Sequence, residues 1–197
     1  MSAIQVAEQK LLDLKTSTGF WLYLMTDVIL FASLFATYAV LHTASANGPT
    51  SREIFELPIA LTETIILLTS SFTCGLALLA LKQEKLRQLV IWLGITYVLG
   101  IAFLTIELTE FSNLIQAGHG WQTSAFLSAF FTLVGTHGLH IFIGLLWLLI
   151  MVVVLIKRGF TPKLKRQLGL FALFWHFLDL VWIFIFTVVY LMGVIPS

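Results

Sequence analysis

The sequence predicts an all-α membrane protein, a bundle of five transmembrane helices, and two observations support this prediction. Of its 197 residues, 59% are hydrophobic and only 11% are charged, which is more apolar surface than a soluble domain of this size can bury. The apolar residues also form five long runs, and a helix of about 20 residues crosses a bilayer core about 30 Å thick. Each run must be helical, because lipid offers no partners for backbone polar groups.

The chain begins with a polar segment, residues 1–18, which carries four charged side chains. We expect it to be a cytoplasmic tail, followed by one transmembrane domain over residues 19–197. The first apolar run, Gly19–Leu41, is too long for the core of a signal peptide, and no small-residue cleavage site precedes charged sequence. We therefore expect this run to be retained as the first membrane span.

Four further runs complete the bundle, separated by segments with polar, glycine or proline turn signals. The predicted spans are approximately Gly19–Leu41, Leu57–Leu81, Gln88–Phe111, Ser124–Ile156 and Leu168–Val194. The segments between them read ASANGPTSRE, KQEKLR, QAGHGWQ and KRGFTPKLKRQ. The fourth run is long enough to tilt in the bilayer or to protrude from it.

The basic residues predict the orientation of the bundle. Ten of the eleven lysines and arginines fall in the N-terminal segment and in the second and fourth connecting segments, whereas only Arg52 lies on the other side. The positive-inside rule then places the N-terminus in the cytoplasm and the C-terminus outside, in the periplasm of a bacterium. An odd number of spans requires the two termini to lie on opposite sides, so the two signals agree.

Charge and cysteine content exclude several classes of function. The net charge is +1 and no basic block is present, so nothing favours nucleic acid as a partner. Cys74 is the only cysteine, which excludes an internal disulfide and any metal site built from paired cysteines. We interpret Cys74 as an inert packing residue.

Seven ionisable side chains lie inside the predicted spans, where each needs a partner or a task because charge is costly in lipid. They are Asp27, Glu63, Glu107, His137, His140, His176 and Asp179. At about 1.5 Å of rise per residue they form two layers. The inner layer, about 12–17 Å from the cytoplasmic face, contains Asp27, His176 and Asp179. The outer layer, at about 24–29 Å, contains Glu63, Glu107, His137 and His140.

The two histidines of THGLH, His137 and His140, share a helix face because they are three residues apart. Haem or metal ligation is one interpretation, but bis-histidine haem needs two histidines at one depth on facing helices, and His176 lies about 10 Å below His137. Structural hydrogen bonding across helices is the interpretation we favour, and a proton relay is a third. We expect Glu107 or Glu63 to hydrogen-bond one of the two imidazoles.

Long motifs in the chain resemble subunit III of haem–copper terminal oxidases. They are GFWLYLMTDVILFASLFATYAVL, FLSAFFTLVGTHGLHIFIGLLW, LFWHFLDLVWIFIFTVVYLMG and IELTEF, and the resemblance extends from Gly19 to Gly193. Two details favour the quinol branch of the cytochrome-bo type. Asp27 in YLMTD stands where cytochrome c oxidase relatives usually carry Glu, and FELPIALTETIILLTSSFTCG is also similar to that branch.

The resemblance implies an accessory subunit of a proton-pumping ubiquinol oxidase in the bacterial inner membrane. Such a subunit has no catalytic, cofactor-binding or metal-binding residues of its own, and haem and copper belong to its partner, the catalytic subunit I. Asp27 matches a carboxylate of the family pattern, and His137, His140 and His176 match its histidines. The resemblance implies that these residues bind phospholipid, pack the helices and support proton uptake in the adjacent catalytic subunit.

The sequence leaves three alternatives to this function. The chain could be subunit III of a bacterial cytochrome c oxidase, because five-span relatives resemble one another closely. It could be a small proton-coupled transporter, although neither an inverted repeat nor a broken helix is evident. A haem-bearing membrane anchor is disfavoured by the depths of the histidines.

Overall fold

The computed structural model describes residues 3–44 and 57–194, and every long element in them is an α-helix. The helices are α1 (Ala3–Leu41), α3 (Leu57–Lys82), α4 (Leu86–Gln116), α5 (Ala125–Arg158) and α6 (Pro162–Ile185), followed by a π-helical segment η1 (Phe186–Leu191) and one turn, α7 (Met192–Val194). Among these residues, five segments are long and apolar enough to cross a membrane. The predicted class of multi-pass, all-helical membrane protein is therefore confirmed.

The largest difference from the predicted boundaries is at the start of the chain. Helix α1 begins at Ala3, and its membrane-spanning part extends from Leu14 to Leu41. From Ala3 onward, the N-terminal segment that we expected to be a tail is therefore the first part of helix α1. The inner end of this span lies about one turn before Gly19, and this changes the depth of every residue counted from it.

Local capping explains the junction between α5 and α6, which is shorter than predicted. Helix α5 ends at Gly159, whose φ of 65° is the left-handed conformation that glycine adopts without strain. Helix α6 then starts at Pro162, with Thr161 as its N-cap accepting from the backbone N–H of Leu164 at 3.2 Å. Most of KRGFTPKLKRQ is consequently helical. The first connecting segment, ASANGPTSRE, lies largely outside the described residues.

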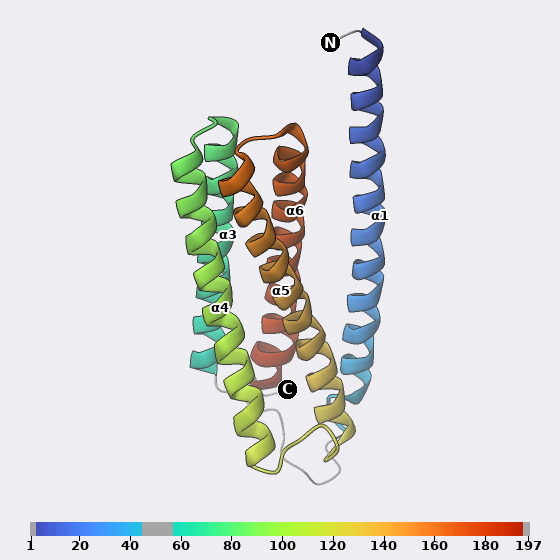
Figure 1. The fold of residues 1–197 in the computed structure, drawn as a ribbon. Helices are drawn as coiled ribbons and strands as arrows, with labels where there is room; N and C mark the ends of the chain where they lie inside the picture. Colours follow the sequence, from blue (N-terminus) through green and yellow to red (C-terminus); the bar gives the residue numbers. More distant parts are fainter. Residues whose placement is uncertain (1–2, 45–56, 195–197) are drawn as a thin grey trace.

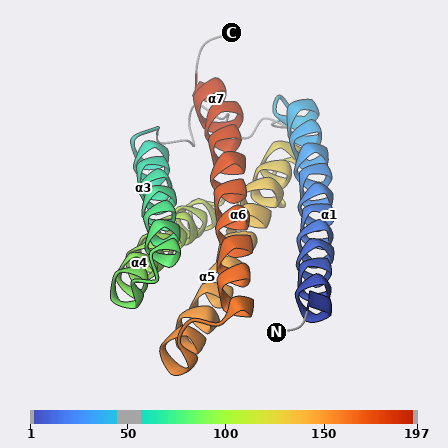
Figure 2. The ribbon, with the colours of Figure 1, turned by 90° about the horizontal axis from the view of Figure 1, so that it is seen from above.

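The helices form an elongated bundle in which sequence neighbours run in opposite directions (Figure 1). The α3–α4 and α5–α6 connections lie at the end of the bundle that holds the N-terminus. Seen from above, α6 stands between α3 and α1, with α4 and α5 behind them (Figure 2). Helix α5 contacts α4, α6 and α1, so it joins the two sides of the bundle.

Small residues allow the closest approaches between α4, α5 and α6. The fully buried indole of Trp175 on α6 lies against Gly100 on α4 and Gly144 on α5. A Cβ added at either glycine would come within 3.0 Å of that ring. Trp182, two turns further along α6, is also buried. The two tryptophans thus form a packing stripe through the middle of the bundle.

Candidate functional site: the ionisable groups inside the bundle

The seven predicted residues all lie in the described helices, and five of them are buried. The buried side chains are those of Asp27, Glu63, Glu107, His137 and Asp179. The side chain of His140 is 12% exposed, and that of His176 is 41% exposed. They fall into three groups, each built from different helices.

The first group joins α1 to α5. The Nε2 of His140 lies 3.8 Å from Oδ1 of Asp27. The Nδ1 of His140 is 2.7 Å from the carbonyl oxygen of Thr136. Because a carbonyl oxygen can only accept, Nδ1 carries a proton and Nε2 faces the carboxyl group. One further proton, held by either the imidazole or the carboxyl group, makes this contact attractive. Phe31 packs beside His140, with 5.2 Å between the two ring centroids.

This pair corrects the predicted layers, which placed Asp27 in the inner layer and His140 in the outer one. The error has two sources. The first span begins before Gly19, so Asp27 lies near the middle of its span, Leu14–Leu41. The fourth span contains 34 residues and crosses the bundle obliquely (Figure 1). Its residues therefore lie less deep than the helical rise alone indicates.

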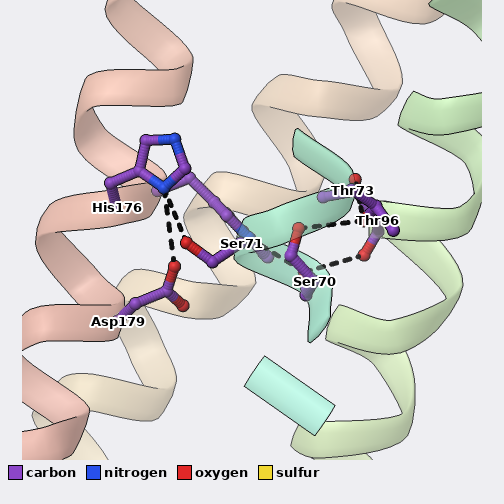
Figure 3. Close-up of polar contacts among 7 residues, drawn as sticks. Ser70, Ser71, Thr73, Thr96, His176 and Asp179 are labelled. Atoms are coloured by element: carbon purple, nitrogen blue, oxygen red, sulfur yellow. Dashed lines mark hydrogen bonds and ion pairs between the residues drawn. The ribbon is translucent and has the colours of Figure 1, made fainter. Parts of the chain in front are cut away.

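The second group joins α3 to α6 and contains a serine that sequence reasoning missed (Figure 3). Ser71 Oγ lies 2.7 Å from Nδ1 of His176, and Oδ2 of Asp179 lies 3.8 Å from the same nitrogen. A serine, a histidine and an aspartate here are not a nucleophilic triad. In such a triad the serine and the carboxylate contact opposite nitrogens of the imidazole, so that a proton can pass through the ring.

Hydroxyl groups beside this second group also connect helices (Figure 3). Ser70 Oγ accepts a hydrogen bond from Trp175 Nε1 at 3.0 Å and donates to the carbonyl oxygen of Thr96 at 3.4 Å. The hydroxyls of Thr73 and Thr96 are 2.8 Å apart. Such contacts hold α3 to α4 and α6, and each contributes about 1 kcal/mol in a membrane. The signal in the sequence was the cluster of small hydroxyl residues in LLTSSFT.

The third group consists of Glu63 on α3, Glu107 on α4 and His137 on α5. The hydrogen bond expected between one of these carboxyls and His137 or His140 is not formed. Neither oxygen of Glu63 and neither nitrogen of His137 has a hydrogen-bond partner within residues 3–44 and 57–194. Glu107 instead packs against the backbone of α5, where a Cβ added to Gly138 would lie 2.6 Å from its Oε1.

The geometry offers no evident metal site in the described helices. No group of three or more histidine, cysteine, aspartate or glutamate side chains among residues 3–44 and 57–194 could hold a metal ion. His137 is enclosed by aromatic rings, with Phe103 at 5.9 Å and Trp182 at 5.3 Å between ring centroids. What these groups can do chemically is to form hydrogen bonds and hold protons.

Comparison with known proteins agrees with this description. A family model described as cytochrome c oxidase subunit III matches residues 4–194. The cytochrome bo(3) ubiquinol oxidase subunit 3 of Pseudomonas aeruginosa is 56% identical over 178 residues, which cover 90% of this chain and 85% of the relative. That of Pseudomonas putida is 53% identical, over 91% and 87%. The cytochrome c oxidase subunit 3 of Bacillus sp. PS3 is 46% identical, over 90% and 86%.

Proposed function

This chain belongs to the cytochrome c oxidase subunit III family, and from that premise we propose that it is subunit III of a bacterial quinol oxidase of the cytochrome-bo type. The observation that carries the proposal is the similarity to ubiquinol oxidase subunits from two Pseudomonas species, which extends over most of both chains at more than half identity. The complex oxidises ubiquinol and reduces oxygen to water while it pumps protons. The chain itself is an accessory subunit.

The accessory role follows from where the polar groups of this chain lie. The hydroxyl and imidazole groups described above connect the chain's own helices, which supports a structural role for them. We assign haem and copper to the catalytic subunit I, the main partner of this chain. The buried polar residues then have structural tasks: they hold the helices together, and around Asp27 and His140 they stabilise bound phospholipid and support proton uptake in the neighbouring subunit.

The proposed topology places the N-terminus in the cytoplasm and the C-terminus in the periplasm of a bacterial inner membrane. The arrangement supports it, since both connections rich in basic residues lie at the N-terminal end of the bundle (Figure 1). Lipid-facing aliphatic side chains such as Ile29, Val98 and Ile150 are exposed along the helices. The proposal comprises one transmembrane domain over residues 19–197 and a cytoplasmic segment, residues 1–18, although the apolar part of α1 already begins at Leu14.

Affinity purification from native membranes tests the proposal directly. A tag placed on this chain should co-purify the haem-containing catalytic subunit and the other oxidase subunits, identified by mass spectrometry. The purified complex should consume oxygen with a ubiquinol analogue as donor. Recovery of the chain without any haem protein, together with proton-coupled solute flux in vesicles, would establish the transporter alternative instead.

A cytochrome c oxidase is the second candidate, because the Bacillus sp. PS3 relative bears that name and covers a similar share of this chain. The two candidates differ in their electron donor. The same purified complex, supplied with reduced cytochrome c in place of the quinol, should remain inactive if the first proposal is right. Turnover with cytochrome c and none with quinol would support the second.

A further inference from the structure

Glu63, Glu107 and His137 come from three helices and lie within about one helical turn of the same level of the bundle. Helices α3 and α4 are antiparallel, and Ser70 contacts the carbonyl of Thr96, so Glu63 lies level with Phe103 on α4, about one turn before Glu107. On α5, Glu107 packs against Gly138, the residue next to His137.

Helix α6 closes this level from the other side through Trp182. Its indole N–H donates to Oγ1 of Thr64, the residue next to Glu63, at 3.1 Å. Its ring also lies 5.3 Å from the imidazole of His137. A single indole thus contacts the neighbour of Glu63 and lies beside His137, so these two side chains are at the same level of the bundle.

Most polar side-chain atoms of these three residues have no partners among the described residues. Glu63 and His137 are 0% exposed and Glu107 is 2% exposed. In the part of the chain that the structure describes, both oxygens of Glu63, Oε2 of Glu107 and both nitrogens of His137 have no hydrogen-bond partner. A buried polar group left in this condition loses its hydration without compensation, so native proteins satisfy such groups almost always.

The surrounding side chains cannot supply the missing partners. The rings of Phe103 and Phe31 enclose His137, at centroid distances of 5.9 and 6.4 Å. The other titratable groups nearby are engaged elsewhere. Glu110 accepts from the hydroxyl of Tyr190 at 3.3 Å, and His140 contacts the carbonyl of Thr136 and the carboxyl of Asp27.

A groove on the outside of the bundle is lined in part by Glu107. It has a volume of about 260 Å³ and lies between α4 and α5. Its walls are the apolar side chains of Leu104, Leu108, Phe111, Leu139 and Phe142, and Gly135, Gly138 and Glu107 complete its lining. Among the three residues, Glu107 is therefore the one that lines this groove.

We propose that Glu63, Glu107 and His137 form an internal hydration site, in which bound water bridges the two carboxyl groups and the imidazole and lets them share protons. Water suits these atoms because it both donates and accepts, and a buried water typically makes two to four hydrogen bonds. Protonated carboxyls can donate to it, carboxylate oxygens accept from it, and the imidazole does both. Proton transfer along such a chain leaves the total number of protons in the site unchanged.

This inference goes beyond the accessory role, since it gives the subunit a water-and-proton site of its own. Two measurements on the intact purified complex test it. A high-resolution cryo-electron microscopy map should show solvent density within hydrogen-bond distance of Glu107 and His137. Infrared spectra should show O–H stretching bands of internal water that shift when the buffer is changed from ordinary water to H₂¹⁸O.

Matched histidine variants identify the origin of the infrared bands. His137→Phe should remove the isotope-sensitive bands assigned to this site, whereas His176→Phe, at an exposed position on α6, should retain them. Glu107→Gln keeps the shape and a polar group, so it should shift the bands rather than abolish them. This variant and the map of the unmodified complex carry the test if His137→Phe does not assemble.

Three outcomes would overturn the proposal. They are a map in which a partner side chain or a lipid group contacts the three residues, a map with no density between them, and a water spectrum unchanged in both His137→Phe and Glu107→Gln. Each outcome can be reached whether the complex uses quinol or cytochrome c. Failure of this inference is therefore distinguishable from failure of the proposed function.

Discussion

At the scale of single residues, three histidines of similar sequence context have three different environments. His137 is sealed among aromatic rings, His140 lies beside Asp27, and His176 is exposed and contacts Ser71. Each environment permits a different task, because hydrogen bonding and proton exchange depend on which nitrogen faces which atom. Two residue-scale predictions follow from Asp27 and from Gly138.

Replacement of Asp27 by Asn should leave the initial rate of oxygen reduction largely intact. The carboxyl contacts His140 at 3.8 Å and belongs to an accessory subunit, so its loss should weaken a helix–helix contact by about 1 kcal/mol. The effect should appear as shorter lifetime during turnover and less bound phospholipid in the purified complex.

The neighbouring variant Thr26→Val is the control for Asp27→Asn, because the Thr26 hydroxyl donates only to the carbonyl of Tyr23 on its own helix. It should resemble the unmodified enzyme in all three measurements. Immediate and complete loss of activity in an intact Asp27→Asn complex would place Asp27 on the proton path itself and contradict the accessory role.

Two glycines one turn apart on α5 should respond differently to alanine. A Cβ at Gly138 would lie 2.6 Å from Oε1 of Glu107, so Gly138→Ala must displace that carboxyl and should destabilise the subunit by about 1–3 kcal/mol. A Cβ at Gly135 would meet only Phe111, at an ordinary 3.6 Å. Gly135→Ala should be neutral or stabilise the helix by up to about 1 kcal/mol. Thermal unfolding of the two variant complexes measures the difference, and equal effects would reject this view of the α4–α5 contact.

At the scale of helices, the connections between the spans also make specific contacts. The turn between α3 and α4 carries Glu84 with a φ of 55°, and its carboxylate forms an ion pair with Lys165 on α6. The hydrogen bond from the Lys165 ammonium, and then its positive charge, lower the pKa of Glu84 below its ordinary value. The ion pair thereby joins the α3–α4 connection to the first turn of α6.

This ion pair predicts a pH-dependent contribution to stability. Because the pKa of Glu84 is lowered in the folded state, the contribution is present above the ordinary glutamate pKa and is lost as the pH falls through the lowered one. Lys165→Met should therefore lower the thermal midpoint slightly at neutral pH, less so in high salt, and not at acidic pH. Lys163→Met is the control for removal of a nearby positive charge. A deficit in Lys165→Met that persists at acidic pH would show that the ion pair is not its cause.

The π-helical segment at the end of α6 is the one element that periodicity gave no reason to expect. Residues 186–191 add width to the last turns of the fifth span. This segment carries Tyr190, whose hydroxyl donates to Glu110 on α4 at 3.3 Å. The wider turn therefore belongs to the part of the helix that reaches across to another helix, and hydrophobicity along the sequence contains no signal for it.

At the scale of the whole molecule, the distribution of basic residues predicts the direction of insertion. A reporter that is active only in the cytoplasm should work when inserted in the α5–α6 connection at Gly159. A reporter that is active only after export should work when fused after Ser197. The reason is the ten-to-one excess of lysine and arginine on the N-terminal side. The opposite pattern of activities would refute the proposed topology.

The sequence by itself determined the class of the protein, its five spans and its family. Length and hydrophobicity are local properties, and lipid leaves the helix as the only structure for an isolated apolar run. The sequence also predicted that seven ionisable residues lie inside the spans. Burial of Glu63, Glu107 and His137 agrees with that prediction.

The tertiary structure decided which of these residues meet. Asp27 lies beside His140 and not in a layer with His176. The hydrogen bond predicted from Glu107 or Glu63 to His137 or His140 is not formed, and Glu107 packs against Gly138 instead. Ser71, overlooked in the sequence, contacts His176. Such choices depend on the tilt, rotation and register of whole helices. A displacement of one turn, about 5.4 Å, is enough to exchange one partner for another.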